Sequence, residues 1–259
     1  MKTILDNIVN NKKREVAELY RSNPHFEKAI QERSFDRSIV QHIENIHKPG
    51  VIAEFKRQSP SKGVINSQSN PIDVIQKYEK AGAIATSVLT DHRFFGGSIS
   101  DLTQVRPHTN LPILRKDFII DKLQIDEAAA SGADIILLIA SILTEKEVFD
   151  FTMHAKTIGL NVLLEVHDEI ELQKACSEID LLGINNRDLK SFTIDYDRSL
   201  RLLDKIDNTF IPISESGLSC SSIVNDLYQA GFKGFLMGEK FMKEEDPGEA
   251  CIQFTRKLK

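Results

Sequence analysis

The stretch GVIAEFKRQSPSKG, residues 50–63, begins like a buried β-strand and ends like a polar loop. Residues 51–53 are apolar, but Glu54 and Lys56 follow where further apolar residues would be expected. Because side chains alternate along a strand, both charged residues share a face with Ile52. Burying charge is costly unless the groups are paired or functional, so the end of this strand is a candidate functional site.

The rest of the chain repeats one pattern, in which a short apolar run is followed by a polar loop and an amphipathic helix. The apolar runs predict eight strands, at residues 51–56, 84–90, 112–116, 134–140, 160–166, 179–185, 210–214 and 234–238. Helices are predicted at residues 71–81, 121–131, 144–158, 168–176, 196–206 and 219–230. This alternation is typical of an α/β protein with a (β/α)8 TIM barrel, and an open doubly wound sheet is the alternative. The open sheet is disfavoured because GxGxxG and GxxxxGK[ST] are both absent.

A helical segment precedes the first strand, since residues 4–20 carry an apolar stripe of helical period. We expect a single domain over residues 1–259, in which residues 1–48 form an N-terminal helical extension and residues 49–259 form the barrel. The length of 259 residues fits one core, because single cores grow to about 250–300 residues.

Composition and charge exclude several classes of protein. The net charge of −5 is dispersed along the chain, so we expect no nucleic-acid partner. The three cysteines lie far apart and the seven histidines include no HExxH pair, so we expect neither a disulfide framework nor a metal site. No run of about 18 apolar residues occurs and the N-terminus lacks the apolar block of a signal peptide, which predicts a cytoplasmic protein without a membrane span.

Four later strands also end in polar residues. The third ends at Lys116, the fifth places Glu165 near its end, the sixth leads to Asn185 and Arg187, and the seventh leads to Glu215. Taken alone, a polar residue at the end of a strand is more often part of the solvated rim of a barrel than part of a catalytic site. Because the carboxyl ends of barrel strands form one face, however, their recurrence favours a convergent polar site in an apolar cup.

Two loops have features of a phosphate site. Ser216 and Gly217 follow the seventh strand, and Gly238 and Glu239 follow the eighth. In many barrels the backbone N–H groups of these loops bind phosphate, and glycine permits close approach. Ser59 of the opening stretch supplies a further hydroxyl donor. Ordinary turns between strand and helix are the alternative interpretation.

Eight motifs occur in order along the chain: AEFKRQSPSKG (53–63), LTDHRFFGGS (89–98), ILRKDFIID (113–121), ADIILLIASIL (133–143), LLEVHDEIEL (163–172), LGINNRDL (182–189), ISESGL (213–218) and FLMGEKFM (235–242). Together they resemble the indole-3-glycerol phosphate synthase family of tryptophan biosynthesis. The resemblance covers nearly the whole chain. It implies a carboxy-lyase that closes the indole ring of 1-(2-carboxyphenylamino)-1-deoxyribulose 5-phosphate, with loss of carbon dioxide and water, and it implies no metal or organic cofactor. We expect a monomer, with a weak dimer as the alternative.

The resemblance also implies catalytic residues, and the chemistry requires such groups. Lys116 is the first candidate for the acid that protonates the ribulose carbonyl as the ring closes. Lys56 is a candidate for holding the substrate's carboxylate. Glu165 and Glu54 are the carboxylates available for the dehydration, with Asn185 holding a hydroxyl. How the two lysines and two glutamates divide these steps is left open by the sequence.

Substrate-binding residues are implied in two groups. The polar group consists of Ser59, Arg187, Glu215, Ser216, Gly217, Gly238 and Glu239. Phe118, Leu137 and Phe94 are candidates for an apolar wall against the aromatic ring, with plain core packing as the alternative.

Three alternative functions are open to a barrel of this kind. Phosphoribosylanthranilate isomerase and the tryptophan synthase α subunit are barrels of the same pathway. The isomerase would be expected to use a Cys and Asp pair, and no cysteine lies at a predicted strand end. A catalytically silent barrel is the third alternative, and the retention of four charged groups at strand ends argues against it.

Overall fold

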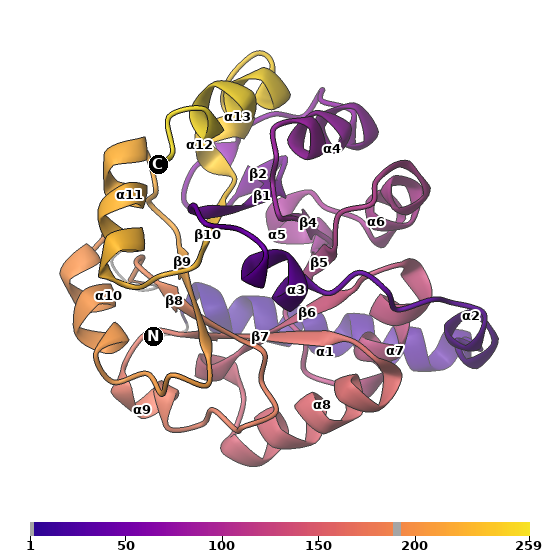
Figure 1. Cartoon of the computed structure of the whole chain (residues 1–259). Helices are drawn as coiled ribbons and strands as arrows, with labels where there is room; N and C mark the ends of the chain where they lie inside the picture. Colours follow the sequence, from indigo (N-terminus) through magenta and orange to yellow (C-terminus); the bar gives the residue numbers. More distant parts are fainter. Residues whose placement is uncertain (1–2, 189–192) are drawn as a thin grey trace.

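The computed structural model describes residues 3–188 and 193–259, and in this part of the chain eight parallel strands close into a barrel (Figure 1). The barrel strands are β1 (Gly50–Phe55), β4 (Ala85–Leu89), β5 (Ile113–Lys116), β6 (Ile135–Ile139), β7 (Asn161–Val166), β8 (Leu181–Asn185), β9 (Ile211–Glu215) and β10 (Gly234–Met237). The last strand, β10, lies between β9 and β1, and β1 also pairs with β4. The predicted (β/α)8 barrel is therefore confirmed, and the open sheet is excluded.

The alternation of side chains along each strand divides the core into two clusters. One cluster fills the barrel interior and includes Ile52, Leu114, Leu137, Leu163 and Ile213. The other lies between the outer face of the strands and the surrounding helices. Both faces of the sheet are thus buried, which explains why the strands are nearly continuous apolar runs.

Helices surround the barrel and begin and end at recognisable residues. Those covering the strands are α4 (Pro71–Lys80), α6 (Ile99–Val105), α7 (Lys122–Ser131), α8 (Glu145–Ile158), α9 (Glu169–Leu172), α10 (Tyr196–Leu203), α11 (Ser221–Ala230) and α13 (Pro247–Thr255). For example, Thr144 and Glu147 form a capping box at the start of α8, and Gly159 ends it in a left-handed conformation. None of these helices, nor any other in the described residues, is long and apolar enough to cross a bilayer.

Three short elements lie in the loops at the carboxyl ends of the strands. They are the two-stranded hairpin of β2 (Gln58–Ser59) and β3 (Gly63–Val64), and the helices α5 (His92–Phe95) and α12 (Glu239–Met242). The helix predicted over residues 168–176 is shorter than expected, because α9 ends at Leu172. Beyond it the chain turns, and the Lys174 ammonium donates to the carbonyls of Ala140 and Leu143.

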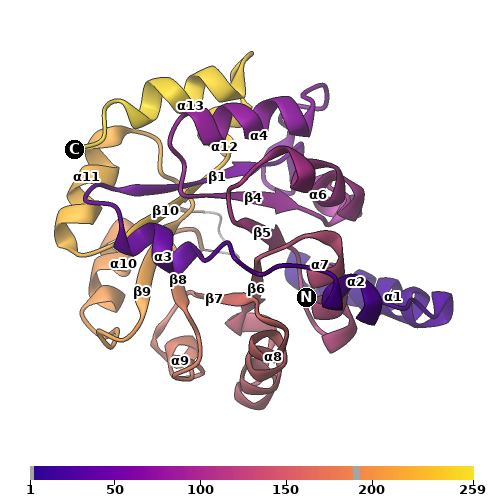
Figure 2. The same ribbon diagram turned by 45° about the vertical axis from the view of Figure 1, so that its right-hand side comes forward.

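The N-terminal extension contacts both ends of the barrel. It contains α1 (Ile4–Ser22), α2 (Glu27–Gln31) and α3 (Ile39–Glu44). In Figure 1, α3 lies in front of the barrel and α1 lies behind it. Ile39 and Ile43 of α3 pack into the interior cluster, where the strands begin. The turned view in Figure 2 shows α1 beside α7, on the side of the barrel where the strands end.

Candidate active site

Five strands bring polar side chains to the carboxyl end of the barrel. Glu54 comes from β1, Lys116 from β5, Glu165 from β7, Asn185 from β8 and Glu215 from β9. Each occupies the last or next-to-last position of its strand. The register sets Asn185 beside Glu215, so these groups lie at one level above the apolar interior.

The centre of this level is an ion cluster around Lys116. Its Nζ lies 2.5 Å from Glu215 Oε2 and 3.2 Å from Glu165 Oε2. The Asn185 amide donates to the other oxygen of Glu165 at 2.9 Å. Both carboxylates are buried, whereas the lysine side chain retains some exposure toward a cavity. One ammonium therefore serves two carboxylates and can still reach a ligand.

The pKa values in this cluster are shifted by burial and by the neighbouring charges. Burial lowers the pKa of Lys116, but the carboxylates of Glu215 and Glu165 outweigh burial, so the pKa lies above its ordinary value. The pKa of Glu215 is raised to about 7, because burial and the negative charge of Glu165 raise it by more than the ammonium of Lys116 lowers it. Burial would also raise the pKa of Glu165, but Lys116 and His167 lower it below its ordinary value. Near neutral pH the cluster thus contains an ammonium, a carboxylate and a carboxyl group close to half-protonation.

A second pair of charges lies at the end of β1. Lys56 Nζ donates to Glu54 Oε1 at 2.6 Å, and both residues line the cavity. Arg57, the next residue along the chain, points to the opposite face of the strand. There its guanidinium forms two hydrogen bonds of 2.5 and 2.9 Å with Asp101 on α6. The alternation of side chains therefore directs Lys56 into the site and Arg57 to the opposite face of the strand, where it holds α6.

Two glycines leave room for the buried carboxylates. A Cβ at Gly183 of β8 would lie 2.2 Å from Glu215 Oε1, and a Cβ at Gly238 would lie 2.6 Å from Glu54 Oε1. Any side chain at either position would displace a carboxylate. The two glycines are thus part of the geometry of the site even though they carry no functional group.

A cavity of about 610 Å³ opens above the cluster. It brings together every site residue proposed from the sequence except Phe94, namely Glu54, Lys56, Ser59, Lys116, Phe118, Leu137, Glu165, Asn185, Arg187, Glu215, Ser216, Gly217, Gly238 and Glu239. Such a volume suits a small-molecule ligand. None of the residues lining it is a cysteine, and no group of His, Cys, Asp or Glu side chains in residues 3–188 and 193–259 is arranged to hold a metal ion.

One end of the cavity is polar and is formed by the last two βα loops. Ser216 has a φ of 68°, an uncommon conformation for a residue with a side chain. Asn186, which is fully buried, donates to the carbonyls of Glu215 and Ser216 and so holds this turn. The Tyr196 hydroxyl donates to the carbonyl of Gly217 at 2.6 Å.

Several cations border the same polar end of the cavity. Arg187 Nη2 lies 3.4 Å from Glu239 Oε2, and Lys62 Nζ lies 3.7 Å from the other oxygen of Glu239. Lys240 and Lys243 complete the lining there. These three lysines could not be predicted from the sequence, because in the chain they resemble ordinary solvated charges.

The other end of the cavity is apolar. The rings of Phe118 and Phe95 lie 5.9 Å apart, and both line the cavity. Phe94, which was expected in the wall, is not part of the lining. Its ring instead lies below the guanidinium of Arg93 at 5.5 Å, because α5 turns the neighbouring Phe95 inward.

Helix α1 adds three further apolar residues to the lining of the cavity, Ile4, Leu5 and Ile8. Their apolar stripe of helical period is visible in the sequence, whereas the surface that the stripe covers is not. No local signal placed α1 above the barrel, since that position depends on contacts with residues about 80 to 105 positions further along the chain.

Comparison with known proteins gives a consistent result. The family model described as "Indole-3-glycerol phosphate synthase" matches residues 5–254. The indole-3-glycerol phosphate synthase of Bacteroides thetaiotaomicron is 42% identical over 261 residues, covering 100% of both chains. That of Prochlorococcus marinus (strain MIT 9515) is 49% identical over 83% of this chain and 74% of the relative. The tryptophan synthase α subunit of Legionella pneumophila superposes with a TM-score of 0.64 over 85% of this chain and 95% of that chain, at 12% identity, which shows a likeness of fold alone.

The barrel, together with acid and base groups at the carboxyl ends of its strands, defines an enzyme of the (β/α)8 class. The family match extends over nearly the whole chain and the relatives are more than 40% identical. The chain belongs to the indole-3-glycerol phosphate synthase family.

Proposed function

We propose that this chain converts 1-(2-carboxyphenylamino)-1-deoxyribulose 5-phosphate to indole-3-glycerol phosphate, carbon dioxide and water. The observation that carries the proposal is the position of Lys116, whose ammonium contacts two buried carboxylates at the floor of the cavity. Family membership supports the same reaction.

The first step is ring closure. The aromatic carbon attacks the ribulose carbonyl carbon while the carbonyl oxygen gains a proton, and Lys116 is the donor. Its raised pKa keeps the ammonium protonated at neutral pH. Glu215, with a pKa of about 7 and an oxygen 2.5 Å from Nζ, is suited to returning a proton to the lysine.

Decarboxylation and dehydration follow. Lys56 holds the substrate's carboxylate until it leaves as carbon dioxide, since its ammonium borders the cavity. Loss of the hydroxyl as water needs an acid, and removal of the remaining proton needs a base. Glu165 and Glu54 supply these groups, and Asn185 keeps Glu165 in place through its hydrogen bond.

The substrate lies across the cavity with its phosphate at the polar end. Ser59, Gly217 and Gly238 provide hydroxyl and backbone donors there, and lysines of the rim provide positive charge. The aryl group then lies against Phe118 and Leu137 at the apolar end. This orientation places the reacting atoms between the two ends, above Lys116.

The deciding experiment is a turnover assay of the wild-type protein with the carboxyphenylamino substrate. The chain contains no Trp, so indole fluorescence from the product can be followed without a background from protein indole. Failure to form product would contradict the proposed function. It would favour a silent barrel if the protein nevertheless binds the substrate.

A substitution tests the role of Lys116. Lys116→Met keeps the length of the side chain but removes the proton, and we expect turnover to fall by at least about 100-fold without unfolding. Lys122→Met, at an exposed position on α7, is the matched control and should retain turnover. Near-normal turnover of Lys116→Met would exclude Lys116 as the acid.

We further propose a cytoplasmic monomer. In the described residues, the exposed large hydrophobic side chains are spread over several elements and include Tyr20, Val64, Phe149 and Ile170. The three cysteines are free thiols, which suits a reducing compartment. Sedimentation velocity over a range of concentrations tests the assembly, and a concentration-dependent increase in mass would indicate the weak dimer.

A further inference from the structure

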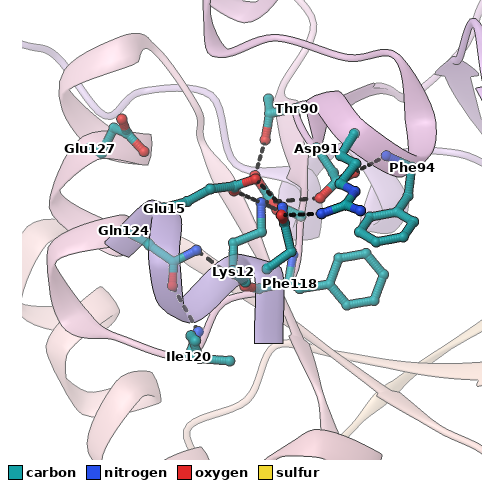
Figure 3. A network of polar contacts seen from close by, with 12 residues as sticks. Lys12, Glu15, Thr90, Asp91, Phe94, Phe118, Ile120, Gln124 and Glu127 are labelled. Carbon is teal, nitrogen blue, oxygen red and sulfur yellow. Dashed lines mark hydrogen bonds and ion pairs between the residues drawn. The ribbon is translucent and has the colours of Figure 1, made fainter. Parts of the chain in front are cut away.

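A buried ammonium lies outside the reacting cluster, on α1. Lys12 is 3% exposed, and its Nζ lies 2.7 Å from Asp117 Oδ1, 3.2 Å from Asp91 Oδ2 and 2.5 Å from Glu15 Oε2 (Figure 3). Asp91 and Asp117 are also buried, whereas Glu15 is partly exposed. Lys12 is not among the residues that line the cavity, so it acts on a ligand only through other residues.

Each of the two buried carboxylates fixes one aromatic residue of the cavity. Asp91 Oδ1 accepts a hydrogen bond from the backbone N–H of Phe94 at 2.7 Å and so caps α5, the helix that carries Phe95. Asp117 Oδ1 accepts one from the backbone N–H of Phe118 at 2.8 Å. The position of the facing pair of rings therefore depends on the two carboxylates that Lys12 joins.

The same lysine fixes the third apolar part of the cavity. Ile4, Ile8 and Lys12 are spaced by four residues, which places them along one face of α1. The two isoleucines reach the cavity, and the lysine reaches the buried carboxylates. A hydrogen bond from Arg93 Nη1 to Asn11 Oδ1, at 3.1 Å, adds an exposed contact beside it.

The two carboxylates depend on Lys12 to different degrees. Lys12 and Arg115 together hold the pKa of Asp117 at about 2 against the effect of burial. Without Lys12, Asp117 would still have Arg115 at 3.3 Å and a hydrogen bond of 2.5 Å from Thr90. Asp91 Oδ2 has no hydrogen-bond partner in the described part of the chain, and Lys12 is the cation that faces it. Loss of the ammonium would therefore affect Asp91 and α5 first.

We propose that Lys12 is a positioning residue. By binding Asp91 and Asp117 it holds α1, Phe95 and Phe118 in the arrangement that receives the aryl group of the substrate. The inference rests on the proposed function, because that function supplies an aryl group at the apolar end of the cavity. A role in stability alone would make no distinction between ligands with and without an aryl group.

The test compares two ligands by isothermal titration calorimetry. Indole-3-glycerol phosphate carries an aryl group, and glycerol 3-phosphate reaches only the polar end. For Lys12→Met we expect the affinity for the first to fall by at least about 10-fold and the affinity for the second to stay within about 2-fold. Lys13→Met, the same change one position along α1 at an exposed site, should alter neither.

The outcomes separate the two roles. Unchanged affinities, or equal losses for both ligands, would overturn the positioning role. If Lys12→Met does not fold, the double variant Lys12→Met with Asp91→Asn removes the ammonium without leaving Asp91 as an unpaired buried charge, while Asp117 keeps Arg115, and the same selective loss is expected. The wild-type turnover assay decides the proposed function by itself, whereas a selective loss, or its absence, reports on Lys12.

Discussion

Glu215 is a carboxyl group whose protonation changes near neutral pH. Burial and the charge of Glu165 raise its pKa to about 7, against an ordinary value of 4.5. The folded protein therefore binds this proton more tightly than the unfolded chain does. The resulting stabilisation is fully present below about pH 4.5 and is lost as the pH rises through about 7.

The variant Glu215→Gln tests this linkage, because an amide does not titrate. From about pH 5 to pH 8 we expect the free energy of unfolding of the variant to rise relative to wild type by about 2 kcal/mol. Urea denaturation at several pH values measures it. Glu244→Gln, at an exposed position, is the control and should follow the wild type throughout. A constant difference between Glu215→Gln and wild type would show that Glu215 does not titrate in this range.

Gly183 tests the geometry around the same carboxylate. A Cβ there would lie 2.2 Å from Glu215 Oε1, so Gly183→Ala should turn the carboxylate away from Lys116 and lower kcat by at least about 10-fold. Gly82→Ala is a suitable control for kcat, since a Cβ there meets nothing within 4 Å, and its φ of 77° strains only the turn before β4, at the opposite end of the barrel from the site. Equal kcat values for the two variants would contradict the role of Gly183 in holding Glu215.

At the scale of elements, strands could be predicted more fully than short helices. The barrel strands follow the apolar runs, and the period of two that selects the face of Glu54 also gives the faces of Lys116 and Glu165. Phe95 could not be selected over Phe94, because α5 has only four residues and its direction is fixed by a cap from Asp91. The position of α1 likewise depends on partners far along the sequence.

The extension is also joined to the barrel wall by a buried ion network. Arg33, just beyond α2, donates to the carbonyls of Ala129, Gly132 and Ala133 and pairs with buried Asp134. Arg106 forms the second ion pair with Asp134. The guanidinium of Arg33 thus supplies hydrogen-bond donors to the carbonyl groups at the end of α7 and neutralises the carboxylate of Asp134, next to β6.

Arg33→Met should destabilise the protein by about 2 kcal/mol, since it removes one of the two cations that face a buried carboxylate. Chemical denaturation gives the value. Arg201→Met is the matched control, because Arg201 is 66% exposed and pairs only at the surface with Asp195, and its effect should stay within about 0.5 kcal/mol. Similar losses in the two variants would contradict the importance of the buried network.

At the scale of the whole molecule, the extension and the barrel share one core. Ile39 and Ile43 of α3 belong to the same interior cluster as Leu114 and Leu163 of the strands. We therefore propose that residues 1–48 and 49–259 unfold together as a single domain. The sequence predicted the extension but not the packing of α3 into the barrel interior. Nothing local in the sequence distinguishes a helix that enters a barrel from one that packs outside it.

Ile39→Ala should lower the free energy of unfolding by about 3 kcal/mol, since the side chain is fully buried. Hydrogen exchange followed by mass spectrometry should show the protection of α3 and of the barrel strands falling by similar amounts. Ile170→Ala, at a position that is 72% exposed, is the control. Loss of protection confined to α3 would show that the extension unfolds separately.

The place of β10 in the ring has a consequence for synthesis of the chain. This strand, Gly234–Met237, lies between β9 and β1, so the sheet has two open edges until residue 237 has been made. Unpaired edges of apolar strands are templates for aggregation. A nascent chain must therefore keep the edge of β1, and the edge of whichever strand was made last, apart from other chains during most of its translation. A shortened chain that ends before β10 would retain the edges of β1 and β9 permanently.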